Sequence, residues 1–208
     1  MDLKEWVKNA LESGKAVLTE AESKTLLGRY GVPVVAETIA NTPADAVAAA
    51  IDLGFPVVLK GLGDGLLHKT EGGLVHLNLT NERSVRSAAE QILETAAASQ
   101  ILVQPQIEGH REFVAGLFRD PHFGPAILFG LGGILTEALS DVVFRLAPLT
   151  CQDATDMIAS IRSRSLLESF RGEEAVDRER LMDTLMGLSA IAADFPEISE
   201  IDINPLIA

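Results

Sequence analysis

Residues 54–75 read GFPVVLKGLGDGLLHKTEGGLV. The apolar run from Pro56 to Lys60 is typical of a buried strand, and the glycines that follow it predict a flexible loop. Lys60 comes at the end of this strand and Lys69 within the loop, and lysines at buried positions are rare unless they are paired. Two lysines beside a glycine loop suit a polyphosphate, because cations and backbone N–H groups can both approach it closely. An ordinary surface turn with solvated lysines would show the same spacing.

Neither of the common nucleotide-binding glycine motifs, GxxxxGK[ST] and GxGxxG, occurs in this loop. His68 lies between the two lysines, and a lone loop histidine is more often a surface residue than a catalytic one.

Two further segments contain groups that suit a ligand site. Gly130, Gly132 and Gly133 follow an apolar strand, where they either let a ligand approach the backbone or form a tight turn.

Residues 200–205, EIDINP, alternate polar and apolar as a half-buried strand does. Glu200, Asp202 and Asn204 therefore share one face, while Ile201 and Ile203 enter the core. Carboxylate and amide oxygens are ligands that Mg²⁺ takes beside substrate phosphates. A solvated strand face fits the same pattern.

Periodicity outside these segments predicts an α/β protein. We expect a hinge or an exposed loop from Gln104 to Glu112, which supplies polar groups for a base and ribose. The expected helices are 3–11, 19–30, 42–54, 81–99 and a broken stretch 152–194, and the expected strands are 34–39, 56–60, 73–79, 101–104, 113–118, 126–129, 142–146 and 200–204.

Composition narrows the class of protein. The net charge of −13 opposes binding to nucleic acid. A single cysteine, Cys151, excludes an internal disulfide and favours a reducing compartment. No signal peptide or membrane-spanning segment is expected, so the sequence predicts a cytoplasmic protein that does not act at a membrane.

Five segments in order resemble a known family. VLTEAESKTLLGRYGVPV, GFPVVLKGLGDGLLHKTEGGLV, ILVQPQIEGHREFVAGLFRDPHFGPAILFGLGGI, DVVFRLAPLT and EIDINPLIA are similar to the ATP-grasp domain of NDP-forming acyl-CoA synthetases. This domain is the beta subunit or domain of ADP-forming acetate–CoA ligase and is related to the beta subunit of succinyl-CoA synthetase. The resemblance covers nearly the whole chain from Lys15 onward.

The resemblance implies two α/β lobes with the nucleotide cleft between them, ATP or ADP as ligand, and Mg²⁺. Residues 1–18 would form an N-terminal helix or extension, residues 19–104 the N-terminal lobe and residues 105–208 the C-terminal lobe. By position, the implied nucleotide contacts are Lys60, Lys69, the hinge from Gln104 to Ile107, Glu112 and the turn containing Gly130, Gly132 and Gly133. Asp202 and Asn204 match the metal motif, and His68 matches a histidine that carries a phosphoryl group.

Two departures from the family pattern stand out. Gln104 and Pro105 lie where relatives usually have an acid, so we expect a different contact to the ribose or base. The family also takes another acidic metal ligand from a further strand beyond the position of Ala208, which predicts a C-terminal lobe that is truncated at its end.

The implied activity is that of an acid–thiol ligase, acyl-CoA + ADP + phosphate ⇌ carboxylate + CoA + ATP. The resemblance implies a CoA-binding alpha subunit or fused domain as partner, and hence a hetero-oligomer. Two alternatives remain open at this point. One is an ATP-grasp ligase that joins a carboxylate to an amine, and the other is a regulatory domain of a protein acetyltransferase fusion.

Overall fold

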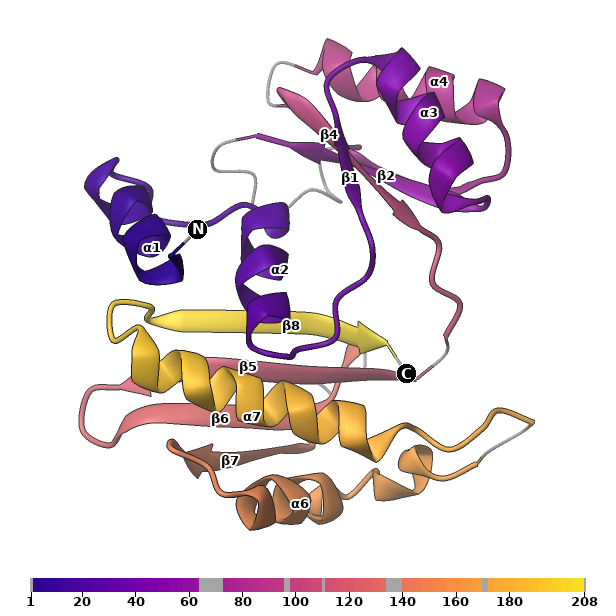
Figure 1. Cartoon of the computed structure of the whole chain (residues 1–208). Coiled ribbons are helices and arrows are strands. Elements are labelled where there is room, and N and C mark those ends of the chain that lie inside the picture. The colour runs from indigo at the N-terminus through magenta and orange to yellow at the C-terminus, as the bar shows by residue number, and fades with distance from the viewer. Residues whose placement is uncertain are drawn as a thin grey trace. The chain divides into compact units, whose positions relative to one another are not determined.

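The computed structural model describes residues 2–63, 73–95, 98–109, 111–133, 140–169 and 172–207. His68 and Lys69 therefore lie outside the described residues. The chain divides into two compact units: unit 1 comprises residues 1–26 and 34–107, and unit 2 comprises residues 27–33 and 108–208. Each unit contains one four-stranded antiparallel sheet with helices (Figure 1).

Unit 1 is built on the strand order β1-β4-β2-β3, formed by β1 (Thr38–Ala40), β2 (Val57–Leu62), β3 (Val75–Leu79) and β4 (Gln100–Pro105). Two helices, α3 (Pro43–Leu53) and α4 (Glu82–Glu94), pack on one face of this sheet. Both begin with a capping box, Thr42 with Asp45 and Asn81 with Ser84, which satisfies the otherwise unpaired N–H groups of the first turn.

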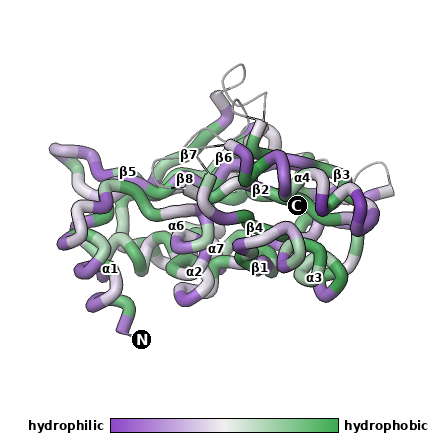
Figure 2. The backbone as a smooth tube through the Cα atoms, turned by 90° about the horizontal axis from the view of Figure 1, so that it is seen from above, coloured by the Kyte–Doolittle hydropathy of each residue, from purple (hydrophilic) through white to green (hydrophobic). Residues whose placement is uncertain are grey.

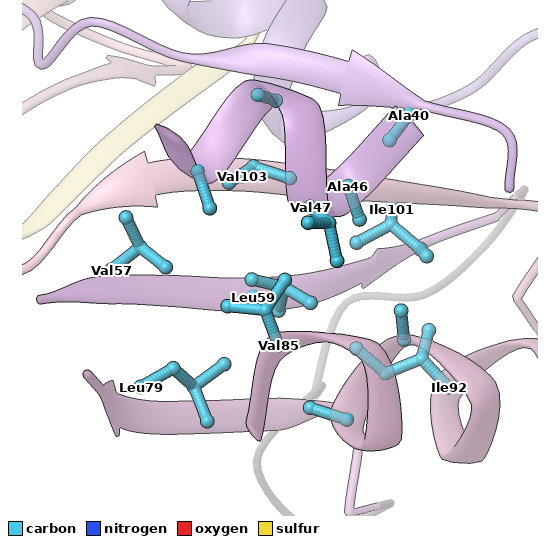
Figure 3. Close-up of a cluster of buried hydrophobic side chains, with 14 of the residues drawn as sticks. Ala40, Ala46, Val47, Val57, Leu59, Leu79, Val85, Ile92, Ile101 and Val103 are labelled. Atoms are coloured by element: carbon cyan, nitrogen blue, oxygen red, sulfur yellow. The ribbon is translucent and has the colours of Figure 1, made fainter. Parts of the chain in front are cut away.

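The core of unit 1 lies between α3, α4 and the sheet. Figure 3 shows Val57 and Leu59 of β2 together with Val47, Val85 and Ile92 of the two helices. All five side chains are buried, and α3 is largely hydrophobic along its length (Figure 2). Their burial provides most of the driving force that holds this layer together.

The opposite face of the same sheet meets the first part of α2 (Glu20–Arg29), where Ala21 packs with Leu62 and Leu102. An additional helix, α1 (Leu3–Glu12), precedes it. A capping box starts α2, because the Thr19 backbone N–H donates to the Glu22 carboxylate and the Glu22 N–H donates to the Thr19 hydroxyl.

Unit 2 has the strand order β7-β6-β5-β8, formed by β5 (Glu112–Asp120), β6 (Gly124–Leu131), β7 (Val142–Leu146) and β8 (Glu200–Ile207). Two helices, α6 (Cys151–Ser160) and α7 (Arg178–Asp194), cover one face of the sheet, and a short 3₁₀ turn, η2 (Arg164–Leu167), lies between them in sequence. Phe113 and Phe129 stack at 5.8 Å on the covered face and are fully buried.

Residues 27–33 belong to unit 2 because they pack on α7. The Tyr30 hydroxyl donates to Asp194 at 2.7 Å, and the Tyr30 ring meets Phe195 edge-on. A side-chain carbon at Gly187 would come within 2.7 Å of the Tyr30 carbonyl, so glycine is needed there for this close approach. Burial and the hydrogen bond to Asp194 raise the pKa of Tyr30 to about 12.

Several of the expected boundaries were wrong. Residues 34–37 form no strand, because only Thr38 to Ala40 pair with β4. α4 ends at Glu94 instead of 99. The expected break in the stretch 152–194 includes residues 172–177, and α7 begins at Arg178. β2 continues to Leu62, so Lys60 lies inside the strand and not at its end.

Candidate functional site

Lys60 lies on the face of the unit 1 sheet that carries α2. It pairs with Leu102 of β4, and its ammonium contacts the Glu20 carboxylate at 2.7 Å. The side chain is 23% exposed. A partly buried lysine that is paired with a carboxylate avoids most of the cost of desolvation, so the structure explains how a cation can sit within a largely apolar strand.

Gln104 lies on the same face, since it pairs with Val58 two positions before Lys60. Its side-chain oxygen accepts a hydrogen bond from the Lys24 ammonium at 2.9 Å. Lys24 also contacts the Glu37 carboxylate at 2.6 Å and the Glu20 carboxylate at 2.9 Å. Two of the predicted nucleotide residues of unit 1, Lys60 and Gln104, are thus connected through charged side chains.

Sequence reasoning missed Glu20, Lys24 and Glu37. The available signal was the spacing of Glu20 and Lys24, because residues four apart on a helix are neighbours on its surface. That spacing shows that the two side chains can pair, but it does not show that they face β2 and β4. The pairing with Lys60 and Gln104 depends on tertiary packing.

Ile107 is the last residue of unit 1 and is 42% exposed. The chain just before it is held by Gln106, whose backbone N–H donates to the Pro56 carbonyl at 2.9 Å and whose side chain accepts from the Asn78 N–H at 3.2 Å. The predicted hinge is therefore fastened at its unit 1 end.

Glu112, Gly132 and Gly133 come together in unit 2, although twenty residues separate the first two in sequence. The Gly132 N–H donates to the Glu112 carbonyl at 2.8 Å. A side-chain carbon at Gly132 would come within 2.5 Å of the Phe113 carbonyl group, and one at Gly133 would collide with the Glu112 carboxylate. Gly133 also has a φ of +70°, which favours glycine.

Gly130 is closely packed between neighbouring strands. It lies within β6, opposite Val114 of β5 and Val142 of β7. A side chain there would collide with the carbonyl of Asp141 and with Val142. Glycine at this position therefore lets the strands approach each other, whatever further contact it makes.

Asp202 and Asn204 lie on β8. Ile201 and Ile203 pair with Leu117 and Ala115, which are buried on the face covered by helices. Asp202 pairs with Gly116 and, by alternation, lies on the opposite face. The expected division into a core face and a polar face is therefore present from Ile201 to Ile203, and Asn204 lies where the pairing with β5 shifts register.

Glu112 lies on the same face of the sheet as Asp202, four residues from Gly116 along β5. This offset corresponds to about 13 Å along a strand. The two carboxylates are thus separate groups on one surface of unit 2. Within the residues that the structure describes, no three His, Cys, Asp or Glu side chains cluster closely enough to hold a metal ion by themselves.

Asp202 nevertheless has properties that fit a cation site. Burial and the neighbouring charge of Glu200 raise the pKa of the Asp202 carboxyl above its ordinary range. A bound cation would offset both causes, because it favours the charged carboxylate. Asp202 and Asn204 together offer two hard oxygen ligands, and Mg²⁺ commonly uses one or two protein carboxylates beside phosphates and water.

A pocket of about 200 Å³ lies elsewhere in unit 1, at the N-terminal end of α2. Its lining is Lys15, Thr19, Ala21, Glu22, Ile39, Leu62, Gly63, Ser99 and Gln100. None of the predicted site residues is in this lining, so the pocket does not mark the site expected from the sequence.

No described helix is long and apolar enough to cross a membrane.

The chain belongs to the ATP-grasp domain family, whose pattern matches residues 9–208. A more specific class follows from individual relatives. The chain is 37% identical over 218 residues to the beta subunit of ADP-forming acetate–CoA ligase I from Pyrococcus furiosus, covering 100% of this chain and 94% of that subunit.

Two further similarities extend this comparison. The chain is 39% identical over 197 residues to ADP-forming 4-hydroxybutyrate–CoA ligase from Nitrosopumilus maritimus, covering 91% of this chain but 28% of that longer protein. It also superposes with a TM-score of 0.93 and 40% identity on the dinucleotide-forming acetyl-coenzyme A synthetase 1 of Ca. Korarchaeum cryptofilum, solved with coenzyme A and Ca-AMPCP, over 100% of this chain and 93% of that one.

A second structure of the Korarchaeum enzyme contains coenzyme A and Mg-AMPPCP, with its phosphohistidine segment pointing towards the nucleotide-binding site. The fold of the present chain is thus the ATP-grasp fold. Its homologues are ADP-forming acyl-CoA ligases, in which the region equivalent to this chain is either a separate beta subunit or part of a longer protein.

Proposed function

We propose that this chain is the nucleotide-binding, phosphoryl-transfer subunit or domain of an ADP-forming acyl-CoA synthetase, with the reaction acyl-CoA + ADP + phosphate ⇌ carboxylate + CoA + ATP. The observation that carries the proposal is the match to nearly the whole of a beta subunit with this activity in its name, at 37% identity. The alternative of a carboxylate–amine ligase finds no comparable support among these relatives.

Each unit would supply nucleotide-binding residues of its own. In unit 1, Lys60 and Lys69 would offset the charge of the phosphates, and the hinge from Gln104 to Ile107 would meet the base through backbone groups. In unit 2, Glu112 and the turn containing Gly130, Gly132 and Gly133 would offer further nucleotide contacts. Residues 19–104 would form the N-terminal lobe and residues 105–208 the C-terminal lobe.

Asp202 and Asn204 would hold Mg²⁺ through their side-chain oxygens. When bound, this ion neutralises phosphate charge and orients the β- and γ-phosphates. The chain's own part is to supply two oxygen ligands on one face of β8, next to Gly116, which has no side chain to crowd them.

His68 would carry the phosphoryl group to ADP. A neutral imidazole near pH 7 is nucleophilic, so it can accept a phosphoryl group from a phosphohistidine and pass it to the terminal oxygen of ADP, which becomes ATP while the free imidazole is regenerated. The phosphohistidine segment of the Korarchaeum enzyme supports such a carrier chemistry in a relative. The partner would be a CoA-binding alpha subunit or fused domain, and with a separate partner the assembly would be a hetero-oligomer.

We place this activity in the cytoplasm, because the single cysteine of the chain suits a reducing compartment. The location is testable by fractionating cells that express the protein and probing each fraction with an antibody. Recovery of the protein mainly outside the cytoplasmic fraction would contradict it.

The nucleotide site is tested with Lys60→Ala. Loss of a charge-assisted contact should weaken ADP binding about 10- to 100-fold by calorimetry. Lys15→Ala is the matched control, because Lys15 is also half-buried and paired with a carboxylate of α2, at 2.8 Å from Glu22. Equal ADP affinity in the Lys60→Ala variant and the unaltered chain would reject the proposed site.

The carrier role is tested with His68→Ala in the complex with the alpha partner. The variant should bind ADP almost normally but should not form ATP. Incubation of the unaltered complex with labelled ATP and Mg²⁺ should give an acid-labile phosphohistidine on this chain. Full turnover by the variant would remove His68 from the mechanism.

A further inference from the structure

Four charged side chains of unit 1 form a row of contacts in which positive and negative charges alternate. The row runs from Lys60 in β2 through Glu20 and Lys24 to Glu37, just before β1. The Lys60 ammonium contacts Glu20 at 2.7 Å, Glu20 contacts Lys24 at 2.9 Å, and Lys24 contacts Glu37 at 2.6 Å. Gln104 joins this charged chain through its hydrogen bond from Lys24. The four charges sum to zero, and none of these charged side chains is more than 24% exposed.

Lys24 is fully engaged within this chain of contacts. An ammonium has three N–H donors, and the Lys24 ammonium has three acceptors within 2.9 Å, on Glu20, Glu37 and Gln104. Lys24 thus has no donor left for a ligand, and its function is to hold its three partners in place. Because an ammonium can only donate, Gln104 must turn its oxygen towards Lys24, which leaves its amide N–H groups for other partners.

Lys60 is in a different position. Within the described part of the chain its ammonium contacts one side chain, Glu20. With three donors and one such partner, Lys60 can keep its contact to Glu20 and still donate to an anionic ligand. The two lysines therefore differ in what they can do, although they share the carboxylate of Glu20.

We infer that Glu20 is a positioning residue for Lys60: the carboxylate, itself held by Lys24, fixes the lysine ammonium where the nucleotide phosphates bind. This inference rests on the proposed role of Lys60. A lysine side chain is long and flexible, and ordering it when the ligand arrives lowers affinity. Glu20 removes part of that cost, because it orders Lys60 before the nucleotide is present.

A purely structural role for Glu20 is the competing explanation. Glu20 is an acidic residue in the first turn of α2, where a negative charge stabilises the helix. Glu22 has the same property, lies in the same turn and is also paired with a lysine, Lys15, at 2.8 Å. Glu22→Ala is therefore a matched control that removes a helix-start acid and an ion pair but leaves Lys60 untouched.

The test is a double-mutant cycle on the full chain with Mg-ADP as the probe, measured by calorimetry. Glu20→Ala should weaken binding about five-fold, as a contact of ordinary coupling strength would. Glu20→Gln, which keeps an oxygen acceptor, should restore most of the affinity. In a Lys60→Ala background, Glu20→Ala should have almost no further effect, and Glu22→Ala should have little effect in either background.

Several results would overturn the inference. One is that Glu20→Ala lowers Mg-ADP affinity as much in the Lys60→Ala background as in the unaltered chain. Another is that Glu22→Ala lowers the affinity as much as Glu20→Ala does. A third is that Glu20→Ala binds Mg-ADP more tightly, which would make Glu20 a competitor of the phosphates. A different result would reject the proposed function. If Lys60→Ala alone leaves ADP affinity unchanged, or the unaltered chain binds no nucleotide, the assigned site is wrong. If Lys60→Ala weakens ADP binding and Glu20→Ala does not, only the positioning role is wrong.

Discussion

The carboxylate of Glu112 occupies the space that a side chain at Gly133 would need. Glu112 begins β5 and Gly133 follows the end of β6, and the Gly132 N–H connects the same two segments by donating to the Glu112 carbonyl. Glycine at position 133 therefore does more than permit a positive φ: it leaves room for the one acidic side chain that the family resemblance assigns to the nucleotide site in this part of unit 2.

Gly133→Ala should reduce ADP affinity as well as stability. Alanine at a φ of +70° costs about 1 kcal/mol or more, and its methyl group must also displace Glu112. Gly124→Ala is the control, because Gly124 has a φ of +83° with nothing within 4 Å of the added carbon. Urea denaturation should show similar losses for both variants, while calorimetry should show weaker ADP binding for Gly133→Ala alone. Equal ADP affinities would mean that Glu112 does not contribute to binding.

Asp141 should make the stability of the protein depend on acid pH. It is buried and accepts backbone hydrogen bonds from Arg162 at 2.8 Å and Ser163 at 2.6 Å. Burial acts to raise its pKa, but hydrogen bonds from Ser163 and Arg162 and the charge of Arg162 outweigh it and leave the pKa below its ordinary value. The charged carboxylate therefore stabilises the folded protein at pH values above the pKa that Asp141 has in the unfolded chain. This stabilisation is lost as the pH falls through the lower pKa that Asp141 has in the folded protein.

Asp141→Asn is accordingly expected to lower the free energy of unfolding by about 1–3 kcal/mol at pH 7, since an amide cannot accept all of these hydrogen bonds. The difference from the unaltered chain should shrink as the pH is lowered from 5 towards 3. Urea titrations at these pH values measure it. A difference that stays constant over this interval would show that Asp141 has the same pKa in the folded and unfolded states.

Arg119 should be important for the stability of unit 2. Its guanidinium donates to the carbonyls of Ala192 at 2.7 Å and Phe195 at 2.9 Å, at the C-terminal end of α7. It also donates to the carbonyl of Ile198, in the turn before β8, at 2.7 Å. Arg119→Ala should lower the free energy of unfolding by about 2 kcal/mol or more. Arg145→Ala serves for comparison, because Arg145 is exposed and donates to the carbonyl of its neighbour Phe144. Similar denaturation midpoints for the two variants would contradict this assignment.

Asp202→Asn should separate function from stability. The raised pKa of the Asp202 carboxyl means that its charged form is disfavoured in the folded protein, so a neutral amide should leave stability unchanged or increase it at pH 7. The same change removes a charged ligand for Mg²⁺ and should weaken Mg-ADP binding, while binding of ADP in the presence of a chelator should change little. Thermal denaturation and calorimetry test both parts, and an equal loss with and without Mg²⁺ would exclude a metal-binding role.

Local sequence signals predicted the local structure well. The expected helix starts at Thr42 and Asn81 are present, because both residues cap their helices, and the alternation of β8 depends on neighbours two positions apart. By contrast, residues 34–37 have a β-like sequence but no partner strand, which only the tertiary structure decides.

The candidate site was predictable to a smaller extent. Lys60, Asp202 and the glycines could be proposed from residue type, strand pattern and resemblance. The partners of these residues could not, because Glu20 meets Lys60 across forty positions and Glu112 meets Gly133 across twenty-one. The sequence likewise gave no sign that Gly130 is needed to keep β6 and β7 close to each other.

The pairing between β5 and β8 contains a register shift between Phe113 and Ala115. From Glu200 to Ile203 the two strands pair residue by residue without a break. The number of residues after Glu200 therefore determines that Asp202 lies opposite Gly116. An insertion or deletion of one residue within this stretch would move Asp202 to the sheet face covered by helices. An isoleucine would then lie on the opposite face in its place. Descendants of this chain should therefore tolerate few length changes within the first half of β8.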